Sequence, residues 1–229
     1  MQKNNYFIPW DDTVDNHDCW NIYPEHRWIH NKLELSLKCG HNAGPIPLLP
    51  KKSGYYILRP IYNLIGWGLN AKKIYIDIND KQSLFDCHPG EFWCEWFEGP
   101  HYSIDYEWDK KWKPIFATEG FNSAENFIKF TRWNKIDIPD IPLPKFLDKL
   151  KDIKYLNIEF KDSKIIEVHL RLGNLLGDWH GLEHAKVIVP AWKSKYMEEA
   201  LLREQQGWHF VYDADLSNLP DPRLGFWYI

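Results

Sequence analysis

The chain has 229 residues, and its 28 basic and 32 acidic side chains give a formal net charge of -4 at pH 7. A chain of this length can bury one sizeable core, either as one unit or as two small lobes. The negative balance offers no general positive field for a phosphate backbone, so nucleic acid is not an expected partner. No apolar stretch reaches membrane-spanning length and no signal-peptide pattern opens the sequence, so we expect a cytoplasmic protein without membrane association.

The cysteines are scattered and lack the CxxC spacing of zinc sites, so we expect four reduced thiols. They are Cys19, Cys39, Cys87 and Cys94. The 13 tryptophans are unusual, but large aromatic side chains mostly bury area in cores. Their number alone therefore does not indicate a base-binding surface.

The first part of the chain predicts an arm and a helix. Residues 1–24 are polar, acidic and aperiodic, which indicates an irregular N-terminal arm. From Pro24, apolar residues recur at helical spacing until Gly40, which predicts one helix. Residues 41–54 have the proline and glycine content of a loop.

Strands dominate the rest of the chain. Residues 55–62 and 73–78 predict strands around a glycine-bearing turn, and residues 91–118 predict an antiparallel meander. Residues 123–130 predict a short helix, and a second short helix ends at Leu150. The remaining predicted elements are strands at 155–160 and 164–172, a helix at 194–205, and closing strands at 209–215 and 225–229.

The strands at 155–160 and 164–172 alternate apolar and polar residues, so one face is core and the other is solvated or functional. If a hairpin joins them, their apolar faces match only when paired residue numbers sum to an even value, as with Glu159 opposite Glu167. The polar residues are Asn157 and Glu159 on the first strand, and Glu167, His169 and Arg171 on the second.

Two carboxylates directly across a ladder repel each other unless something neutralises them. A divalent cation would do so, and so would Arg171 or a lysine. Without metal, Glu167→Gln would then be neutral or mildly stabilising, because it relieves repulsion. The alternative interpretation is an amphipathic hairpin whose charged face simply lies in water.

A second candidate for a functional motif is DWHGLEH at residues 178–184. His180, Glu183 and His184 match the H-x-x-E-H pattern, which on a helix would indicate an inverted zinc-protease motif. Gly181 weakens a helix there, so the preferred interpretation is that these histidines lie at the surface or beside a site without binding metal themselves. An unrelated zinc hydrolase remains the third functional alternative.

In their order, four segments resemble the ATP-grasp superfamily over about residues 25–175, in a small, minimal form of the kind that phages encode. PEHRWIHNKLELSLKCGHNAGPIP is similar to the opening helix, and YYILRPIYNLIGWGL to the strand that leads into a glycine-rich phosphate loop. EFWCEWFEGPHYSIDYEW is similar to the adenine hinge. NIEFKDSKIIEVHLRLGN is similar to the signature that holds the metal–phosphate assembly.

The resemblance implies an α+β fold of two small lobes with antiparallel sheets around a nucleotide cleft. It implies a core at residues 25–190, with residues 191–229 as a C-terminal helix and closing strands of the same unit. The usual separate N-terminal domain is expected to be lacking, so substrate recognition would come from loops, the C-terminal region or a partner.

The site residues also follow from the resemblance. ATP would be bound by Lys32, Arg59, Gly66, Gly68, Glu95, Trp96, Phe97 and His101. Mg2+ or Mn2+ would be held by Glu159, Glu167 and His169, and Arg59 and Arg171 would be catalytic. The sequence departs from the family pattern at Arg59 in place of lysine, at Cys94 or Glu95 in the hinge, at His101 in place of glutamate, and at His169 in place of asparagine.

The implied activity is that of an ATP-dependent carboxylate–amine ligase with an acyl-phosphate intermediate, acting on small-molecule or peptide substrates. The departures at the family positions support an alternative. In that alternative, a catalytically degenerate protein keeps the fold and binds a nucleotide, a protein partner or a second copy of itself.

Overall fold

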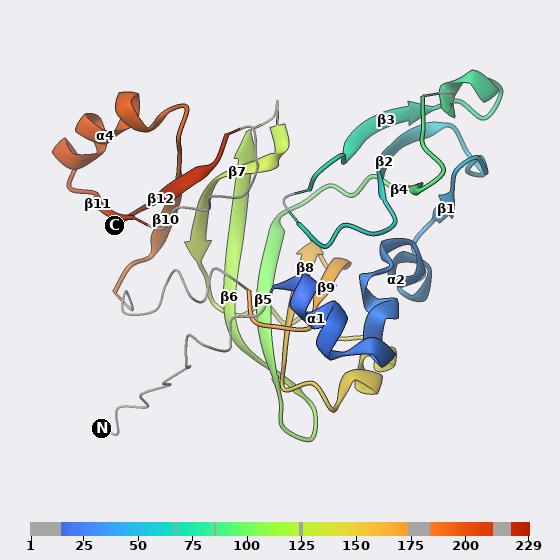
Figure 1. Ribbon diagram of the computed structural model, residues 1–229, viewed down its shortest axis with the longest axis horizontal. Helices are drawn as coiled ribbons and strands as arrows, with labels where there is room; N and C mark the ends of the chain where they lie inside the picture. The colour runs from blue at the N-terminus through green and yellow to red at the C-terminus, as the bar shows by residue number, and fades with distance from the viewer. Residues whose placement is uncertain (1–14, 67, 85, 124–125, 174–183, 213–220) are drawn as a thin grey trace.

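Two antiparallel sheets make up most of the computed structural model, and short helices lie beside them (Figure 1). The residues that the structure describes are 15–66, 68–84, 86–123, 126–173, 184–212 and 221–229. The arrangement confirms the predicted fold class, which is α+β with antiparallel sheets in two lobes. No helix in these ranges is long and apolar enough to cross a membrane.

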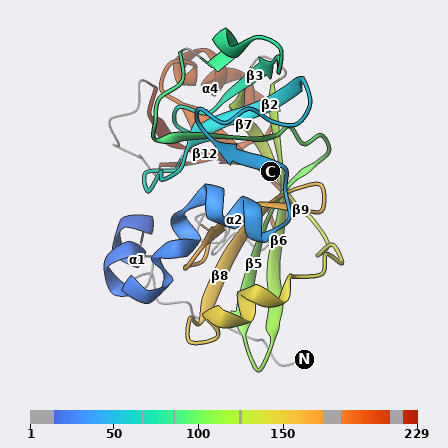
Figure 2. The same cartoon turned by 90° about the vertical axis from the view of Figure 1, so that its right-hand side faces the viewer.

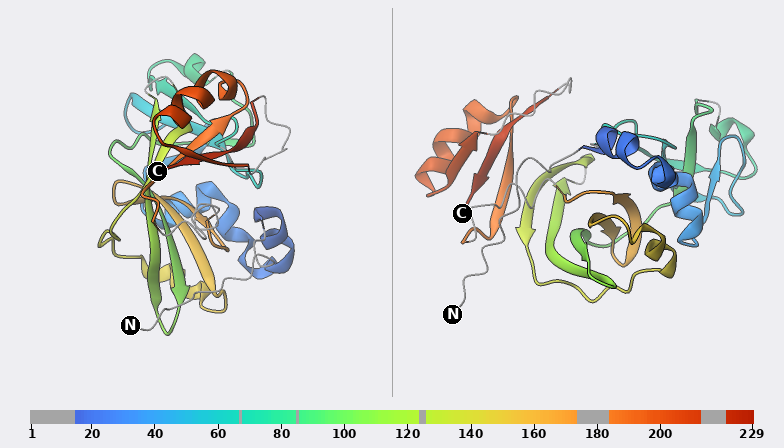
Figure 3. Two further views of the ribbon diagram at one scale, coloured as in Figure 1. Left: turned by 90° about the vertical axis from the view of Figure 1, so that its left-hand side faces the viewer. Right: turned by 60° about the horizontal axis from the view of Figure 1, so that its bottom comes forward.

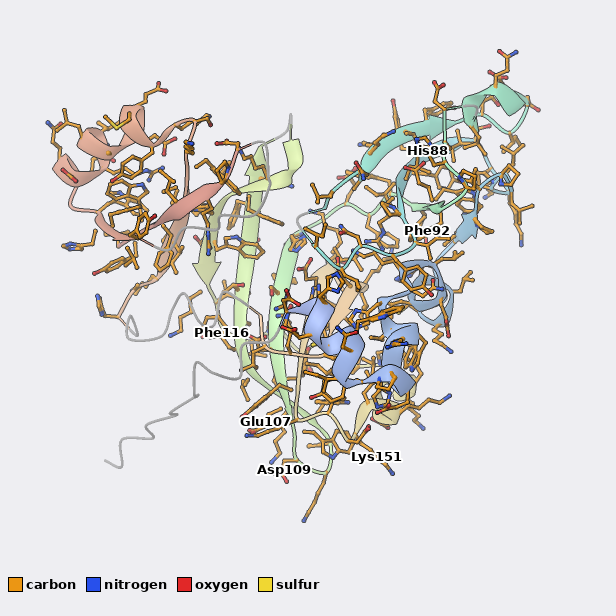
Figure 4. The ribbon with its side chains drawn as sticks, in the orientation of Figure 1. His88, Phe92, Glu107, Asp109, Phe116 and Lys151 are labelled. Atoms are coloured by element: carbon orange, nitrogen blue, oxygen red, sulfur yellow. The ribbon has the colours of Figure 1, made fainter. Side chains whose placement is uncertain are left out.

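The smaller sheet has the strand order β1-β4-β2-β3. Its strands are β1 Ala43–Pro45, β2 Gly54–Pro60, β3 Lys72–Ile76 and β4 Glu91–Glu95, and the 3-10 helix η3 Lys81–Leu84 follows β3. Strand β4 is buried on both faces: Trp93 packs with Tyr56 on one side, and Phe92, which is labelled in Figure 4, packs toward Leu33 on the other. A side chain at Gly44 would lie 2.6 Å from the Trp93 ring, so this close approach of β1 requires glycine.

The larger sheet has eight strands in the order β11-β12-β10-β7-β6-β5-β8-β9 and curves strongly along its width (Figure 3). Its strands are β5 His101–Trp108, β6 Trp112–Ser123, β7 Asn126–Lys135, β8 Tyr155–Lys161, β9 Lys164–His169, β10 Val187–Trp192, β11 His209–Tyr212 and β12 Arg223–Tyr228. The C-terminal helix α4 Tyr196–Gln205 packs on the β10–β12 end through Tyr196 and Ala200.

The helices near the N-terminus lie against the β8–β9 edge and below the smaller sheet (Figure 2). They are α1 Asn16–Ile22, the 3-10 helix η2 Pro24–His30 and α2 Lys32–Lys38, and a further 3-10 helix, η4 Lys145–Leu150, precedes β8. Apolar residues of β5, β8 and β9 face these helices and form the main core. Its fully buried members include Ile104, Leu156, Ile158 and Phe160.

Two predictions for the N-terminal part were wrong. Residues 16–22 are not irregular but form α1, because the side chains of Asp15 and Asp18 make a reciprocal capping box. The single helix expected from Pro24 is broken at Asn31, whose side-chain oxygen accepts the Glu34 amide at 2.9 Å and starts α2.

Three predictions for the strands also need correction. The expected meander at residues 91–118 is divided, because β4 pairs with β1 and β2 while β5 pairs with β6 in the other sheet. The short helix expected at residues 123–130 is wrong, since β7 occupies most of that range. Strand β10 was not predicted, and β1 lies in a segment expected to be a loop.

Candidate functional site

A cleft of about 980 Å³ lies between the two sheets. All twelve residues that the resemblance assigned to ATP, metal or catalysis line it, although they come from α2, both sheets and the loops between them. They are Lys32, Arg59, Gly66, Gly68, Glu95, Trp96, Phe97, His101, Glu159, Glu167, His169 and Arg171. The structure therefore brings together residues separated by up to 139 positions in the chain, from Lys32 to Arg171.

The β8–β9 hairpin has the register that its alternation predicts. Glu159 pairs with Glu167 and Asn157 with His169, so the even-sum pairing is confirmed. The register shifts only beyond Glu159, at the turn end of the hairpin. The two carboxylates therefore stand on the same face, toward the cleft.

Lys32 neutralises one of these carboxylates. Its Nζ lies 2.7 Å from Glu167 Oε1, and the two side chains are 7% and 17% exposed. Burial raises the pKa of Glu167, but Lys32, through its charge and its hydrogen bond, and His169 together outweigh burial and hold the pKa below its usual range. The sequence left the choice between a metal, Arg171 and a lysine open, and the structure shows a lysine in hydrogen-bond contact.

Two imidazoles surround the other carboxylate. His101 Nε2 lies 3.4 Å from Glu159 Oε2, and His169 Nε2 lies 3.6 Å from Glu159 Oε1. Burial raises the pKa of Glu159, but these two imidazoles outweigh it and hold the pKa well below its usual range. Glu159 is therefore an anion at neutral pH even though its side chain is only 28% exposed.

Asn16 orients the His169 ring. Its Oδ1 lies 2.9 Å from His169 Nδ1, and both residues are buried. With Nδ1 donating to this oxygen, Nε2 is the ring nitrogen that faces Glu159 and Glu167, at 3.6 and 3.9 Å. A metal-binding histidine characteristically donates its second ring nitrogen in this way.

Two carboxylates and an imidazole Nε2 are a suitable donor set for Mn2+, and the carboxylates also suit Mg2+. Glu159, Glu167 and His169 could therefore hold a divalent cation. The ligand atoms of these three residues do not, however, surround one common position. Within the described residues, the group whose ligand atoms all lie within 4.8 Å of one another is Glu25, His26 and Asp152, outside the cleft.

A buried polar network lies beside the hairpin, and the sequence analysis missed it. Asp105 Oδ1 accepts from Asn157 Nδ2 at 2.9 Å and from the Gly173 amide at 2.7 Å, and Asn157 also donates to Ser103. Burial raises the pKa of Asp105 to about 7. The sequence does contain a pattern that indicates this network, because β5 alternates polar residues at 101, 103 and 105 with apolar residues at 102, 104 and 106.

The two predicted catalytic arginines differ in their surroundings. Arg59, on β2, donates from Nη2 to the Ile166 carbonyl of β9 at 2.9 Å and stacks over the Phe92 ring at 5.3 Å. It therefore connects the two sheets across the cleft. Arg171, just after β9, donates from Nη1 to the Leu172 carbonyl at 2.7 Å.

The hinge residues lie where the chain crosses from one sheet to the other. Glu95 Oε1 accepts the Asn42 amide at 3.0 Å, while Phe97 is buried against the ring of His41. The Trp96 ring lies under Lys73, with Nζ 4.2 Å from its centroid. Glu95 is the last residue of β4, and its backbone amide donates to the Asn42 carbonyl at 2.9 Å.

The glycine-bearing turn follows β2. Gly66 and Gly68 have φ angles of 81° and 58°, which glycine adopts without strain. The Asn63 side chain brackets Gly66, since it accepts the Gly66 amide at 3.1 Å and donates to its carbonyl at 2.8 Å. Trp67 and most of the DWHGLEH motif, His180 and Glu183 included, lie outside the described residues.

No protein-family model matches the sequence, and no curated protein matches it either. The fold does have solved counterparts. An N5-carboxyaminoimidazole ribonucleotide synthetase (PurK) in complex with ADP is 11% identical, with a TM-score of 0.60 over 95% of this chain and 74% of that one. The carboxyaminoimidazole ribonucleotide synthase of Aspergillus clavatus with ATP is 10% identical, with a TM-score of 0.59 over 95% and 75%.

A third solved structure is also similar in fold to this chain. The N5-carboxyaminoimidazole synthetase of Staphylococcus aureus with ADP is 12% identical, with a TM-score of 0.56 over 90% of this chain and 68% of that one. Likeness at such low identity concerns the arrangement of the backbone. The chain therefore has an ATP-grasp-like fold.

Proposed function

We propose that the chain is an ATP-dependent carboxylate–amine ligase that works in the cleft between the sheets. The observation that carries this proposal is the cleft wall, where a carboxylate pair, an oriented imidazole and the cations of Lys32, Arg59 and Arg171 converge. The similar folds that were crystallised with ADP or ATP support an adenine nucleotide as the ligand.

In this reaction a substrate carboxylate attacks the γ-phosphorus of ATP, so that an acyl phosphate forms and ADP leaves. An amine then attacks the acyl carbon, and the amide forms as inorganic phosphate leaves and takes up the proton that the nitrogen loses. Arg59 and Arg171 neutralise the oxygens of the transferred group. Glu159, Glu167 and His169 would hold a divalent cation, which would supply further positive charge. The cleft walls protect the acyl phosphate from water.

The cleft is large enough for this role. Pockets for a single small ligand usually measure about 300–1,000 Å³, and this cleft lies at the top of that range with about 980 Å³. Its volume supports simultaneous binding of a nucleotide and a second molecule, as a two-substrate ligase requires.

Thermal unfolding with ATP, ADP or AMP, each with Mg2+ or Mn2+, tests the proposal. A nucleotide at 100 times its Kd adds about 2.7 kcal/mol to the free energy of unfolding, which raises the Tm of a chain of this size by about 5–10 °C. We expect this gain with ATP and a divalent cation. The absence of any shift with every adenine nucleotide would contradict nucleotide binding.

Arg59→Ala is expected to remove most of the gain, and Arg59→Lys to keep part of it, because lysine keeps the charge but loses the bidentate fork. The control is Arg132→Ala, since Arg132 also stacks on a phenylalanine, Phe121 at 4.2 Å, but does not line the cleft. Equal losses in the two alanine variants would show that Arg59 acts only through stability.

A non-catalytic nucleotide-binding protein is the second candidate. Two observations favour it: Lys32 already pairs with Glu167, and Arg59 already bonds the Ile166 carbonyl. Hydroxylamine distinguishes the two candidates, because it converts an acyl phosphate into a hydroxamate. Hydroxamate formation from ATP and a panel of carboxylates supports the ligase, and nucleotide binding without ATP turnover supports the second candidate.

A further inference from the structure

The cleft continues beyond the carboxylates toward the C-terminal part of the larger sheet. There its walls come from β7, β10 and the residues around the start of β12. We call this end the aryl subsite and define it by Phe130, Trp133, Trp192, Lys129, Asp221 and Arg223. None of these residues belongs to the nucleotide or metal machinery proposed above.

His101 joins the aryl subsite to the carboxylate pair. Its ring centroid lies 4.7 Å from that of Phe130 and 5.8 Å from that of Trp133, both edge to face. The same imidazole lies 3.4 Å from Glu159. A flat molecule against these rings would therefore have one end beside the proposed phosphoryl-transfer site.

The sheet is built to present these rings. The β6–β7 register shifts on both sides of Asn122, which pairs with Phe130. A side chain at Gly120 would lie 2.7 Å from both Phe130 and Trp133, so glycine allows the rings to lie over β6. Their centroids are 4.3 Å apart, which places the two rings in direct contact.

Among the described residues, charged side chains gather at the far end of the subsite. Lys129 lies over the Trp192 ring at 4.4 Å and forms an ion pair with Asp221. Asp221 also accepts from the amide and hydroxyl of Ser194, at 2.8 and 2.7 Å, so that the carboxylate is fixed. With Arg223, the charged side chains that define the subsite sum to +1.

We propose that the aryl subsite binds a flat aromatic molecule that carries an anionic group, either a carboxylate or a phosphate. Aromatic side chains offer stacking or edge contacts to the ring, and the ammonium and guanidinium groups offer charged hydrogen bonds to the anion. That this molecule is the substrate bound beside ATP is an inference that rests on the proposed ligase function. Binding itself requires no nucleotide, and it can be measured separately.

The probes are phenylacetate, phenyl phosphate, benzylamine, acetate and inorganic phosphate, titrated into the nucleotide-free protein by ligand-observed NMR. We expect phenylacetate or phenyl phosphate to bind at least tenfold more tightly than benzylamine and than either small anion. The tighter of the two aryl anions identifies the preferred anionic group. Equal affinity for benzylamine, equal affinity for the small anions, or no binding of either aryl anion would overturn the inference.

Lys129→Met should weaken aryl-anion binding about tenfold. The control is Lys135→Met, on the same strand, because Lys135 lies over Phe116 at 5.9 Å and does not line the cleft. Phe130→Leu provides a second variant should Lys129→Met fail to fold, and it should also weaken binding while leaving the ATP response intact. Equal losses in the lysine variants, or unchanged binding in Phe130→Leu, would contradict the subsite.

The two proposals can fail independently. Aryl-anion binding by a protein that no adenine nucleotide stabilises would refute the ligase and leave the subsite. A normal response to ATP without any aryl-anion binding would refute the subsite and leave the ligase.

Discussion

Replacing Lys32 by methionine tests how the polar face of the β8–β9 hairpin tolerates two carboxylates. Lys32 is 6% exposed, and its Nζ lies 2.7 Å from Glu167 Oε1. Methionine has a similar length and a good helix propensity, so the start of α2 should persist without the charge. The variant would leave Glu167 facing Glu159 across the ladder without the lysine.

The magnitude follows from the burial of the pair. Breaking a buried ion pair by removing one partner costs about 3–5 kcal/mol, and the repulsion across the ladder adds about 0.2–1 kcal/mol. The Glu167 side chain is 17% exposed, so water screens part of its charge. We therefore expect a loss of about 2–4 kcal/mol in the free energy of unfolding, measured by urea denaturation.

Glu167→Gln separates the charge from the hydrogen bond. Considered from the hairpin alone, this substitution would be neutral or mildly stabilising. The contact with Lys32 changes the expectation, because glutamine can still accept from the ammonium but leaves its charge buried and unpaired. We expect a loss of about 1–3 kcal/mol, and a coupling of about 2 kcal/mol in the double-mutant cycle with Lys32→Met.

A divalent cation should compensate for the missing ammonium. Mn2+ should therefore raise the unfolding free energy of Lys32→Met more than that of the unchanged protein. The control is Lys38→Met in the exposed Glu34–Lys38 pair of the same helix, for which we expect a loss below about 0.5 kcal/mol. A coupling energy near zero, with equal responses of both proteins to Mn2+, would refute the reasoning.

Two further predictions concern the network beside the hairpin. The pKa of Asp105 is about 7 in the folded chain and 3.8 for an ordinary aspartate, so its contribution to stability is complete below about pH 4 and is lost as the pH rises through about 7. Urea denaturation at pH 5 and pH 8 should show a smaller difference for Asp105→Asn than for the unchanged protein, and an equal difference would exclude Asp105 as the titrating group. A side chain at Gly173 would lie 2.6 Å from Asn157 Nδ2, so Gly173→Ala should cost about 1–3 kcal/mol, whereas Gly90→Ala, with nothing within 4 Å, should cost little. Similar losses in both glycine variants would contradict the close packing at Gly173.

The alternation of side chains along each strand was sufficient to predict which faces of the hairpin are apolar and which are polar. Because side chains alternate faces along β8 and β9, matching their apolar faces requires an even-sum register, and the pairing of Glu159 with Glu167 has it. The register shift beyond Glu159, at the turn end of the hairpin, was not predicted. The same alternation on β5 would have identified Ser103 and Asp105. Those residues were missed because the segment was interpreted through its resemblance to a hinge rather than through its own pattern.

The failures share a different cause. Residues 126–130 lie in β7 because β6 and β10 of the larger sheet pair with that strand, and such pairing cannot be recognised in a local window of sequence. The division of β4 and β5 between two sheets has the same origin, since a strand's partners are decided by the whole topology. Asn16 and Lys32 reach the hairpin only because α1 and α2 pack on its edge.

The charges on the hairpin's polar face also constrain what the cleft can bind. The formal charges of Glu159, Glu167 and Lys32 sum to -1, and all three side chains are less than a third exposed. A buried excess of negative charge is unfavourable unless a cation lies nearby. Arg59 and Arg171 also line the cleft and compensate at longer range. A ligand that brings both a divalent cation and phosphate oxygens matches both signs of this surface, whereas a purely anionic or purely cationic ligand matches only one.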